Sequence, residues 1–158
     1  MSSGLCVIGC DPGSTTGLAV AYWDEESWSF PAAYQCDGSS AAALLCYLVR
    51  ANRQLRTRAA VEEFRAGTGA GARGPHASVT RTLVDDLTAV LKAGGVTVVA
   101  RPAVTVKLWA TDKRLAKAGL LEVCRGMPHS VDAFRHLLFT ACHDYGVPDP
   151  LSRKTTSR

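Results

Sequence analysis

Carboxylates occupy two places in this sequence where strands ordinarily bury apolar residues. Asp11 directly follows the apolar run from Leu5 to Cys10, and Glu62 lies inside a second short apolar run, Arg58 to Phe64. Charged side chains are almost never buried without an ionic partner or a metal ion. Binding of a metal ion is therefore one explanation for carboxylates in these settings.

Each carboxylate also has an ordinary structural explanation. Asp11-Pro12-Gly13 is typical of a turn, in which the Asp side chain accepts a local hydrogen bond and Pro sets its own φ. Strand alternation places Glu62 and Glu63 on opposite faces, so an edge strand with one solvated face would account for one of them. Neither motif by itself distinguishes ordinary structure from a functional site.

His129 and Asp132 are three residues apart at the start of a predicted helix, Ser130 to Tyr145, and project from the same side of it. This spacing fits a shared ligand site. His136 and His143 continue the same polar stripe, opposite an apolar one. If the apolar stripe packs on a sheet, Asp132 points away from that sheet unless the first turn of the helix overhangs its end. A solvated polar face explains His136 and His143, and we leave both outside the predicted site.

Basic side chains gather around Trp109 and predict contacts with phosphate groups. The chain has 18 Lys and Arg against 14 Asp and Glu, which weakly favours a polyanionic partner. A solvated helix face explains any one of these residues equally well. The Gly-rich segment Arg65 to Pro75 lacks the Gly-Lys-Ser/Thr ending of a phosphate-binding loop, which excludes a nucleotide site there. The candidate phosphate-contacting residues are Lys107, Lys113, Arg114, Lys117 and, in the Gly-rich segment, Arg73.

Apolar periodicity and turn residues predict alternating strands and helices in one α/β domain. A chain of 158 residues, nearly half of them apolar, suffices for one core but not for two ordinary domains. Strands are predicted at Leu5–Cys10, Gly17–Trp23, Ser27–Tyr34, Arg58–Phe64 and Val96–Ala100. Helices are predicted at Ala41–Arg53, Ser78–Ala93, Asp112–Ala118 and Ser130–Tyr145, and a loop or short strand at Pro102–Trp109. The domain is expected at residues 1–147 and a disordered basic tail at residues 148–158.

The sequence predicts a cytoplasmic protein without membrane contact. No stretch has the roughly 18 uninterrupted apolar residues of a membrane span, and the start of the chain lacks the regions of a signal peptide. Six cysteines are scattered without a C-x-x-C pair. This pattern predicts buried, reduced thiols rather than a zinc site.

Read in order, four segments resemble the signature blocks of RuvC-type Holliday junction resolvases, particularly short phage-encoded members. They are IGCDPGSTTGLAV, AAVEEF, RPAVTVKLWATDKRLAK and HSVDAFRHLL. Their order and spacing match from about Leu5 to His143, and together they are far more specific than any one block. The resemblance implies a ribonuclease H-like fold, a three-layer α/β structure whose five-stranded mixed sheet is flanked by helices and has its first and fourth strands side by side. It also implies a homodimer, in the cytoplasm of a bacterial host if the protein is phage-encoded.

The resemblance further implies a site. By matching motif positions, the catalytic and metal-binding residues would be Asp11, Glu62, His129 and Asp132. They would hold two Mg²⁺ or Mn²⁺ ions, and Lys107 with Lys113 or Lys117 would contact the DNA near the scissile phosphate. The third ligand is often Asp in this family. A His ligand in its place should weaken Mg²⁺ relative to Mn²⁺, because Mg²⁺ prefers oxygen ligands.

The activity implied is hydrolysis of phosphodiester bonds in branched DNA, in which two ions bridged by Asp11 activate water and stabilise the leaving oxygen. Three alternatives remain open. The opening segment also resembles the phosphate-binding turn of an actin-like ATPase, although a chain of 158 residues supplies only one of the two domains such a fold needs. The protein could instead be a junction-binding module with little catalysis. It could also cut flaps and forks as readily as four-way junctions, because branch recognition depends on the shape of the dimer.

The dimer surface is not specified by a motif. The predicted helix Ser78–Ala93 carries more apolar residues than one narrow stripe requires. The excess is explained either by a dimer contact or by additional packing in the core.

Overall fold

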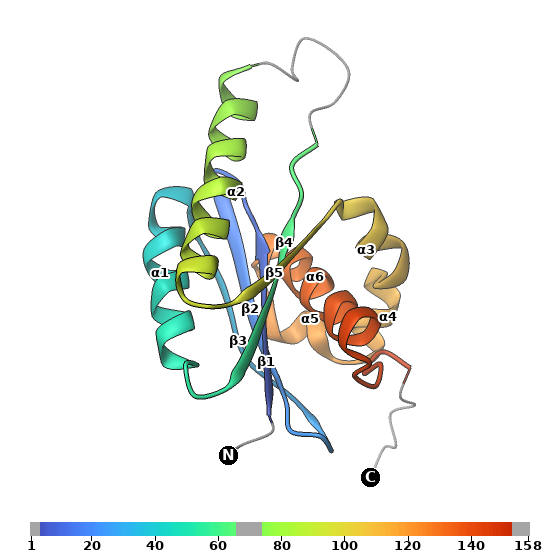
Figure 1. Cartoon of the computed structure of the whole chain (residues 1–158). Helices are drawn as coiled ribbons and strands as arrows, with labels where there is room; N and C mark the ends of the chain where they lie inside the picture. The colour runs from blue at the N-terminus through green and yellow to red at the C-terminus, as the bar shows by residue number, and fades with distance from the viewer. Residues whose placement is uncertain (1–3, 66–73, 153–158) are drawn as a thin grey trace.

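The computed structural model describes residues 4–65 and 74–152, and Figure 1 shows how its elements are arranged. The strands are β1 (Leu5–Asp11), β2 (Thr15–Trp23), β3 (Trp28–Asp37), β4 (Arg56–Glu62) and β5 (Thr97–Arg101). The helices are α1 (Gly38–Ala51), α2 (Pro75–Ala93), α3 (Ala103–Trp109), α4 (Asp112–Lys117), α5 (Leu120–Val123) and α6 (Pro128–Tyr145).

The five strands form one mixed sheet in the order β3-β2-β1-β4-β5. The first three strands make an antiparallel meander, whereas β4 runs parallel to both β1 and β5. Parallel neighbours need a crossover connection, and α2 supplies it between β4 and β5. The predicted five-stranded mixed sheet, with its first and fourth strands side by side, is confirmed.

Helices cover both faces of this sheet and complete a three-layer arrangement (Figure 1). Because side chains alternate along a strand, the fully buried β1 serves two cores. Cys6, Ile8 and Cys10 pack with α1 and α2, whereas Val7 packs with α4, α5 and α6. The carboxyl end of β1 therefore lies in the middle of the sheet, beneath helices on either face.

Helix α6 is covered on more than one side. It packs on β1, β2 and β4 and also against α3. As a result, residues 133–138 are all buried, which leaves no solvated stripe through the middle of the helix. The predicted solvent-facing polar stripe of this helix is therefore wrong at its centre.

The segment Pro102–Trp109 is the clearest departure from the predicted secondary structure. Residues 103–109 form helix α3, not a loop or strand. Val and Thr have weak helix propensity, but propensity is a weak prior that packing overrides. Here Val106 is fully buried on the inner side of α3, and the adjoining Ala110 is fully buried as well. The short helix α5 was also not predicted from the sequence.

The chain remains folded beyond residue 147. Leu151 is 5 % exposed, the indole Nε1 of Trp28 donates to the carbonyl of Pro148 at 2.8 Å, and Asp149 pairs with Arg114 at 2.6 Å. These contacts anchor residues 148–152, in contrast to the prediction that a disordered tail begins at Pro148. Residues 153–158, the rest of that predicted tail, lie outside the described residues.

All six cysteines are free, and Cys6, Cys10 and Cys124 are buried. Cys46 is exposed, in contrast to the expected burial. Among residues 4–65 and 74–152, no helix is long and apolar enough to cross a membrane.

Candidate functional site

Asp11 and Glu62 end neighbouring parallel strands. The last pair of the β1–β4 register joins Cys10 to Val61, so the two carboxylates follow one residue later, side by side. Both belong to the face covered by α6, because Gly9, two residues before Asp11, meets Ala133 of that helix. Glu63 follows on the opposite face and pairs with Arg65 at 3.2 Å.

Two glycines let the first turn of α6 lie directly on the sheet. A Cβ atom at Gly17 would lie 2.1 Å from the carbonyl carbon and oxygen of His129, and one at Gly9 would lie 2.0 Å from the carbonyl oxygen of Ala133. Gly17 pairs with Asp11 in the β1–β2 register. The start of α6 therefore overhangs the end of the sheet at Asp11, which is the condition under which Asp132 can approach the strand ends.

The first turn of α6 is also hydrogen-bonded to β3. The backbone N–H of His129 donates to Oε1 of Gln35 at 3.1 Å, and the hydroxyl of Ser130 donates to the carbonyl of Tyr34. These bonds orient His129 so that its Nδ1 lies 2.9 Å from Oδ2 of Asp11. The His129 side chain remains 44 % exposed, so its ring borders the site on the solvent side.

Asp132 is held between two cations. Nζ of Lys107 lies 2.9 Å from its Oδ2, and the guanidinium of Arg135 binds its Oδ1. The Arg135 guanidinium also binds Asp112 and donates through Nε to the carbonyl of Ala110 at 2.9 Å. Lys107 of α3 therefore lies beside Asp132, and its predicted contact with phosphate stays a prediction. The buried Arg135 was not predicted from the sequence.

His136 contacts Glu62 from within the core. Its side chain is 1 % exposed, and its Nε2 lies 3.1 Å from Oε2 of Glu62. Sequence reasoning placed His136 on a solvated face, which is wrong because α6 is covered there as well. Its spacing of four residues from Asp132 and seven from His129 was the available signal, since positions i, i+3 and i+7 share one side of a helix.

Asp11 interacts electrostatically with the three other predicted ligands, Glu62, His129 and Asp132. Burial raises the pKa of its carboxyl to about 6, and the nearby carboxylates of Glu62 and Asp132 add to the increase, while the hydrogen bond and charge of His129 oppose it. The carboxylates on β1, β4 and α6 therefore repel one another across a largely desolvated space. A divalent cation among them would relieve this repulsion.

The remaining candidates are arranged differently. Arg114 donates to the carbonyl of Trp109, stacks on its indole ring and pairs with Asp149, so it supports the fold. Lys113 is exposed on α4, and the ring of His143 stacks on Phe139. Lys117 is exposed near the end of α4. Arg73 lies outside the described residues.

The donor set fits a hard divalent cation. Three carboxylates and one imidazole, from β1, β4 and α6, match the oxygen and nitrogen ligands that Mg²⁺ and Mn²⁺ accept. Within the described part of the chain, no group of three or more His, Cys, Asp or Glu side chains is close enough together to hold an ion. Lys107 and Arg135 occupy both oxygens of Asp132. Asp132 would have to share or exchange these partners to act as a ligand.

The contact between His136 and Glu62 leads to a first prediction. His136→Leu removes the imidazole that contacts the Glu62 carboxylate at 3.1 Å and puts an apolar side chain of similar size in its place. Outer partners of metal ligands are worth about 10- to 100-fold in metal affinity or activity, so we expect a loss of that size in Mn²⁺ affinity. Titration of thermal stability with Mn²⁺ measures it.

The conservative variant His136→Gln serves as the control, because its amide can still donate to Glu62. We expect it to recover a large part of the Mn²⁺ affinity. If Leu and Gln variants bind Mn²⁺ equally, His136 only fills space.

Comparisons with known proteins agree with this geometry at the level of the fold. No protein-family model and no curated protein sequence matches the chain. The structure of Thermus thermophilus RuvC in complex with a Holliday junction substrate is similar at a TM-score of 0.63 and 18 % identity, covering 90 % of this chain and 96 % of that one. Another Thermus thermophilus RuvC structure is similar at a TM-score of 0.62 and 18 % identity, covering 89 % and 96 %. The chain therefore has the ribonuclease H-like fold of RuvC.

Proposed function

We propose that this protein is a metal-dependent endonuclease that cuts branched DNA. One observation carries the proposal: Asp11 and Glu62 end neighbouring strands beside His129 of α6, and burial, reinforced by the charges of Glu62 and Asp132, raises the pKa of Asp11 to about 6. A carboxylate cluster of this kind is costly to the fold unless a cation binds it. The fold it shares with RuvC supports the choice of nucleic acid as substrate, at 18 % identity.

Divalent ions bound here would activate a water molecule and stabilise the charge that develops on the cleaved phosphodiester. Asp11 and Glu62, on adjacent strand ends, would bind them from the sheet side, and His129 and Asp132 from α6. The ammonium of Lys107, on the exposed side of Asp132, would approach a backbone phosphate and offset its negative charge. His136 would hold the Glu62 carboxylate in one orientation.

The test is a gel assay on a four-way junction, a flap and plain duplex, each with Mg²⁺, Mn²⁺ or chelator. The wild type and the Glu62→Gln variant, which removes a negative ligand but not the side-chain volume, are compared. Metal-dependent paired nicks in the junction, absent from Glu62→Gln, support a junction resolvase. Equal cutting of flap and junction favours a broader branch nuclease. Junction binding with no cutting under any condition would show a binding module instead.

A second prediction concerns the metal. His129→Asp replaces the imidazole beside Asp11 by a fourth carboxylate that could bind a hard ion, in addition to Asp11, Glu62 and Asp132. Because Mg²⁺ prefers oxygen donors more strongly than Mn²⁺ does, we expect the ratio of Mg²⁺- to Mn²⁺-supported cleavage to rise. Rates measured over a range of each metal check it. Complete inactivity with both ions would mean that His129 does something other than bind metal.

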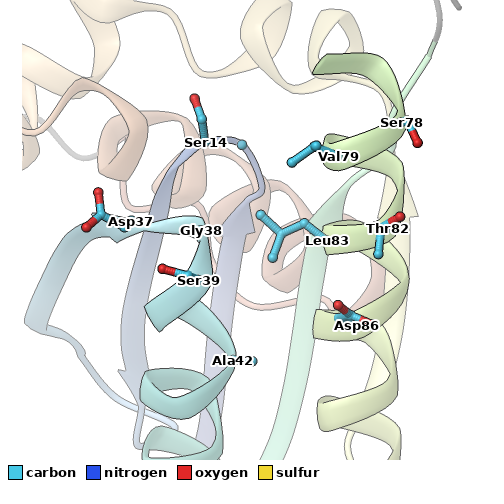
Figure 2. Close-up of a pocket in the computed structure, with 11 residues that line it drawn as sticks. Ser14, Asp37, Gly38, Ser39, Ala42, Ser78, Val79, Thr82, Leu83 and Asp86 are labelled. Atoms are coloured by element: carbon cyan, nitrogen blue, oxygen red, sulfur yellow. The ribbon is translucent and has the colours of Figure 1, made fainter. Parts of the chain in front are cut away.

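Symmetric nicks in a two-fold junction require two sites related by the same symmetry, which favours a homodimer. Val79 of α2 is 56 % exposed, and Figure 2 shows Val79 and Leu83 pointing into a cavity of about 510 Å³ between α1 and α2. Leu87 and Leu91, farther along the same helix, are fully buried in the core. The exposed first turns of α2 are therefore our candidate dimer surface, and the second half of the helix belongs to the core.

Substitution at Val79 tests this surface as a third prediction. Val79→Lys places a charge on an exposed apolar position, so the fold should tolerate it while a dimer that buries this position should dissociate. Sedimentation velocity should show a shift from dimer to monomer, and the gel assay should show single nicks in place of paired ones. A variant that stays dimeric would exclude this face.

A further inference from the structure

A second cavity adjoins the candidate metal site. It has a volume of about 630 Å³, lies between α3 and α6, and shares Lys107 and Asp132 with the site. We call it the α3–α6 cavity. Its size is within the range of clefts that bind small organic groups.

The walls of the α3–α6 cavity are of two kinds. Leu121, Pro128 and Val131 supply aliphatic surface, whereas Thr111 and Asp112 supply a hydroxyl and a carboxylate. A flat group with apolar faces and a hydrogen-bonding edge suits such walls. Proteins bind unstacked nucleobases in this way, with the face of the base against apolar side chains and its edge on polar groups.

The charges in the cavity argue against a phosphate as its occupant. Two cations, Lys107 and Arg135, line it together with two carboxylates, Asp112 and Asp132. The Arg135 guanidinium is committed to both of these carboxylates and to the carbonyl of Ala110. The formal charges cancel, so the cavity favours an uncharged group over an anion.

We propose that the α3–α6 cavity receives an unstacked nucleobase next to the scissile phosphate. The grounds are its balanced formal charges, its aliphatic wall and its position beside Asp132. This inference rests on the proposed nuclease function and adds a source of substrate selectivity to it. A base at a branch point or mismatch costs less to unstack than one inside a regular duplex. The enzyme would therefore act faster where the DNA can release a base into the cavity.

The experiment uses the full-length Asp11→Asn protein, which should bind a four-way junction without cutting it. Junctions carry 2-aminopurine at single positions on either side of the bond that the wild type cleaves. This analogue fluoresces more strongly when it leaves the base stack, and the wall of Leu121, Pro128 and Val131 contains no aromatic ring to quench it. We expect fluorescence to rise at one position on binding.

The cavity is then filled with Val131→Trp for cleavage. Because an indole would itself quench 2-aminopurine, the fluorescence variant is Val131→Met combined with Asp11→Asn. We expect the variant with Asp11 intact to cleave at least about tenfold more slowly, and the variant with Asp11→Asn to show no fluorescence rise. Both should still bind the junction, and the former should still be stabilised by Mn²⁺. Leu121→Trp fills the opposite side and repeats the test if Val131→Trp does not fold. Tyr47→Trp, on an exposed part of α1 beyond the other face of the sheet, is the matched control and should behave as wild type.

The outcomes distinguish failure of the base-binding inference from failure of the proposed nuclease function. A fluorescence rise that disappears on filling supports the inference. Junction cleavage by wild type without a rise at any flanking position, or with a rise that survives filling, overturns the inference alone. Absence of metal-dependent cleavage by wild type overturns the proposed function and the inference together.

Discussion

Asp11→Asn is expected to abolish cleavage of branched DNA while making the metal-free protein more stable. The amide keeps the shape of the side chain but not its charge, so a cation at the site loses its central ligand. We expect the cleavage rate to fall at least about 10³-fold. Junction binding should be retained, because the substitution removes no contact to phosphate.

The gain in stability follows from the raised pKa of Asp11, about 6 in the folded protein against an ordinary value of 3.8. Between these values the folded state holds a proton that the unfolded state has lost, so the stability of the wild type falls as the pH rises. Above pH 6 both states are ionised, and the full cost is at most about 3 kcal/mol. Asn carries no charge and avoids this cost, although it weakens the contact with His129.

Thermal melting in chelator from pH 4 to pH 7 measures this effect. The stability difference between variant and wild type should grow up to about pH 6 and then level off. Asp144→Asn is the matched control, because Asp144 pairs with Arg101 at 2.5 Å and its loss should destabilise the fold. Added Mn²⁺ should stabilise wild type only. A destabilised or cleavage-competent Asp11→Asn protein would contradict our assignment of the site.

Gly17→Ala is expected to inactivate the enzyme by moving α6 away from the strand ends. The added methyl would lie 2.1 Å from backbone atoms of His129, which are not the end of a flexible side chain and must shift together with the helix. Overpacking of this kind costs about 1–3 kcal/mol. Displacement of catalytic groups by about 1 Å can reduce a rate 100-fold, so we expect a loss of at least that size per folded molecule.

The control for Gly17→Ala must lose stability without moving the site. Gly95, in the turn between α2 and β5, has φ of +76° and nothing within 4 Å of an added Cβ. Gly95→Ala therefore costs about 1–2 kcal/mol through backbone strain alone. Urea unfolding gives the stability of each variant, and cleavage is measured where both are fully folded. Normal cleavage by folded Gly17→Ala would show that α6 does not need this close approach.

Local patterns in the sequence were sufficient to predict most of the sheet and the identity of its acidic positions. Apolar runs and turn residues specified the strands because alternation and turn chemistry act over a few residues. The interruption of those runs by Asp11 and Glu62 was visible for the same reason. The spacing of His129 and Asp132 placed them on one side of a helix, and the resemblance to known resolvases joined these local signals into one predicted site.

How α6 packs on the other elements could not be predicted from local patterns. A single polar stripe is read as solvated when a helix is considered alone, but α6 packs on β4 as well as against α3, and His136 is buried beside Glu62 at the end of β4. The packing of α3 against α6 favours a helix at residues 103–109, against their propensity, and brings Lys107 to Asp132. The close approach at Gly9 and Gly17 likewise depends on which backbone lies opposite. These features join residues far apart in the chain, and no local pattern encodes which surface will cover another.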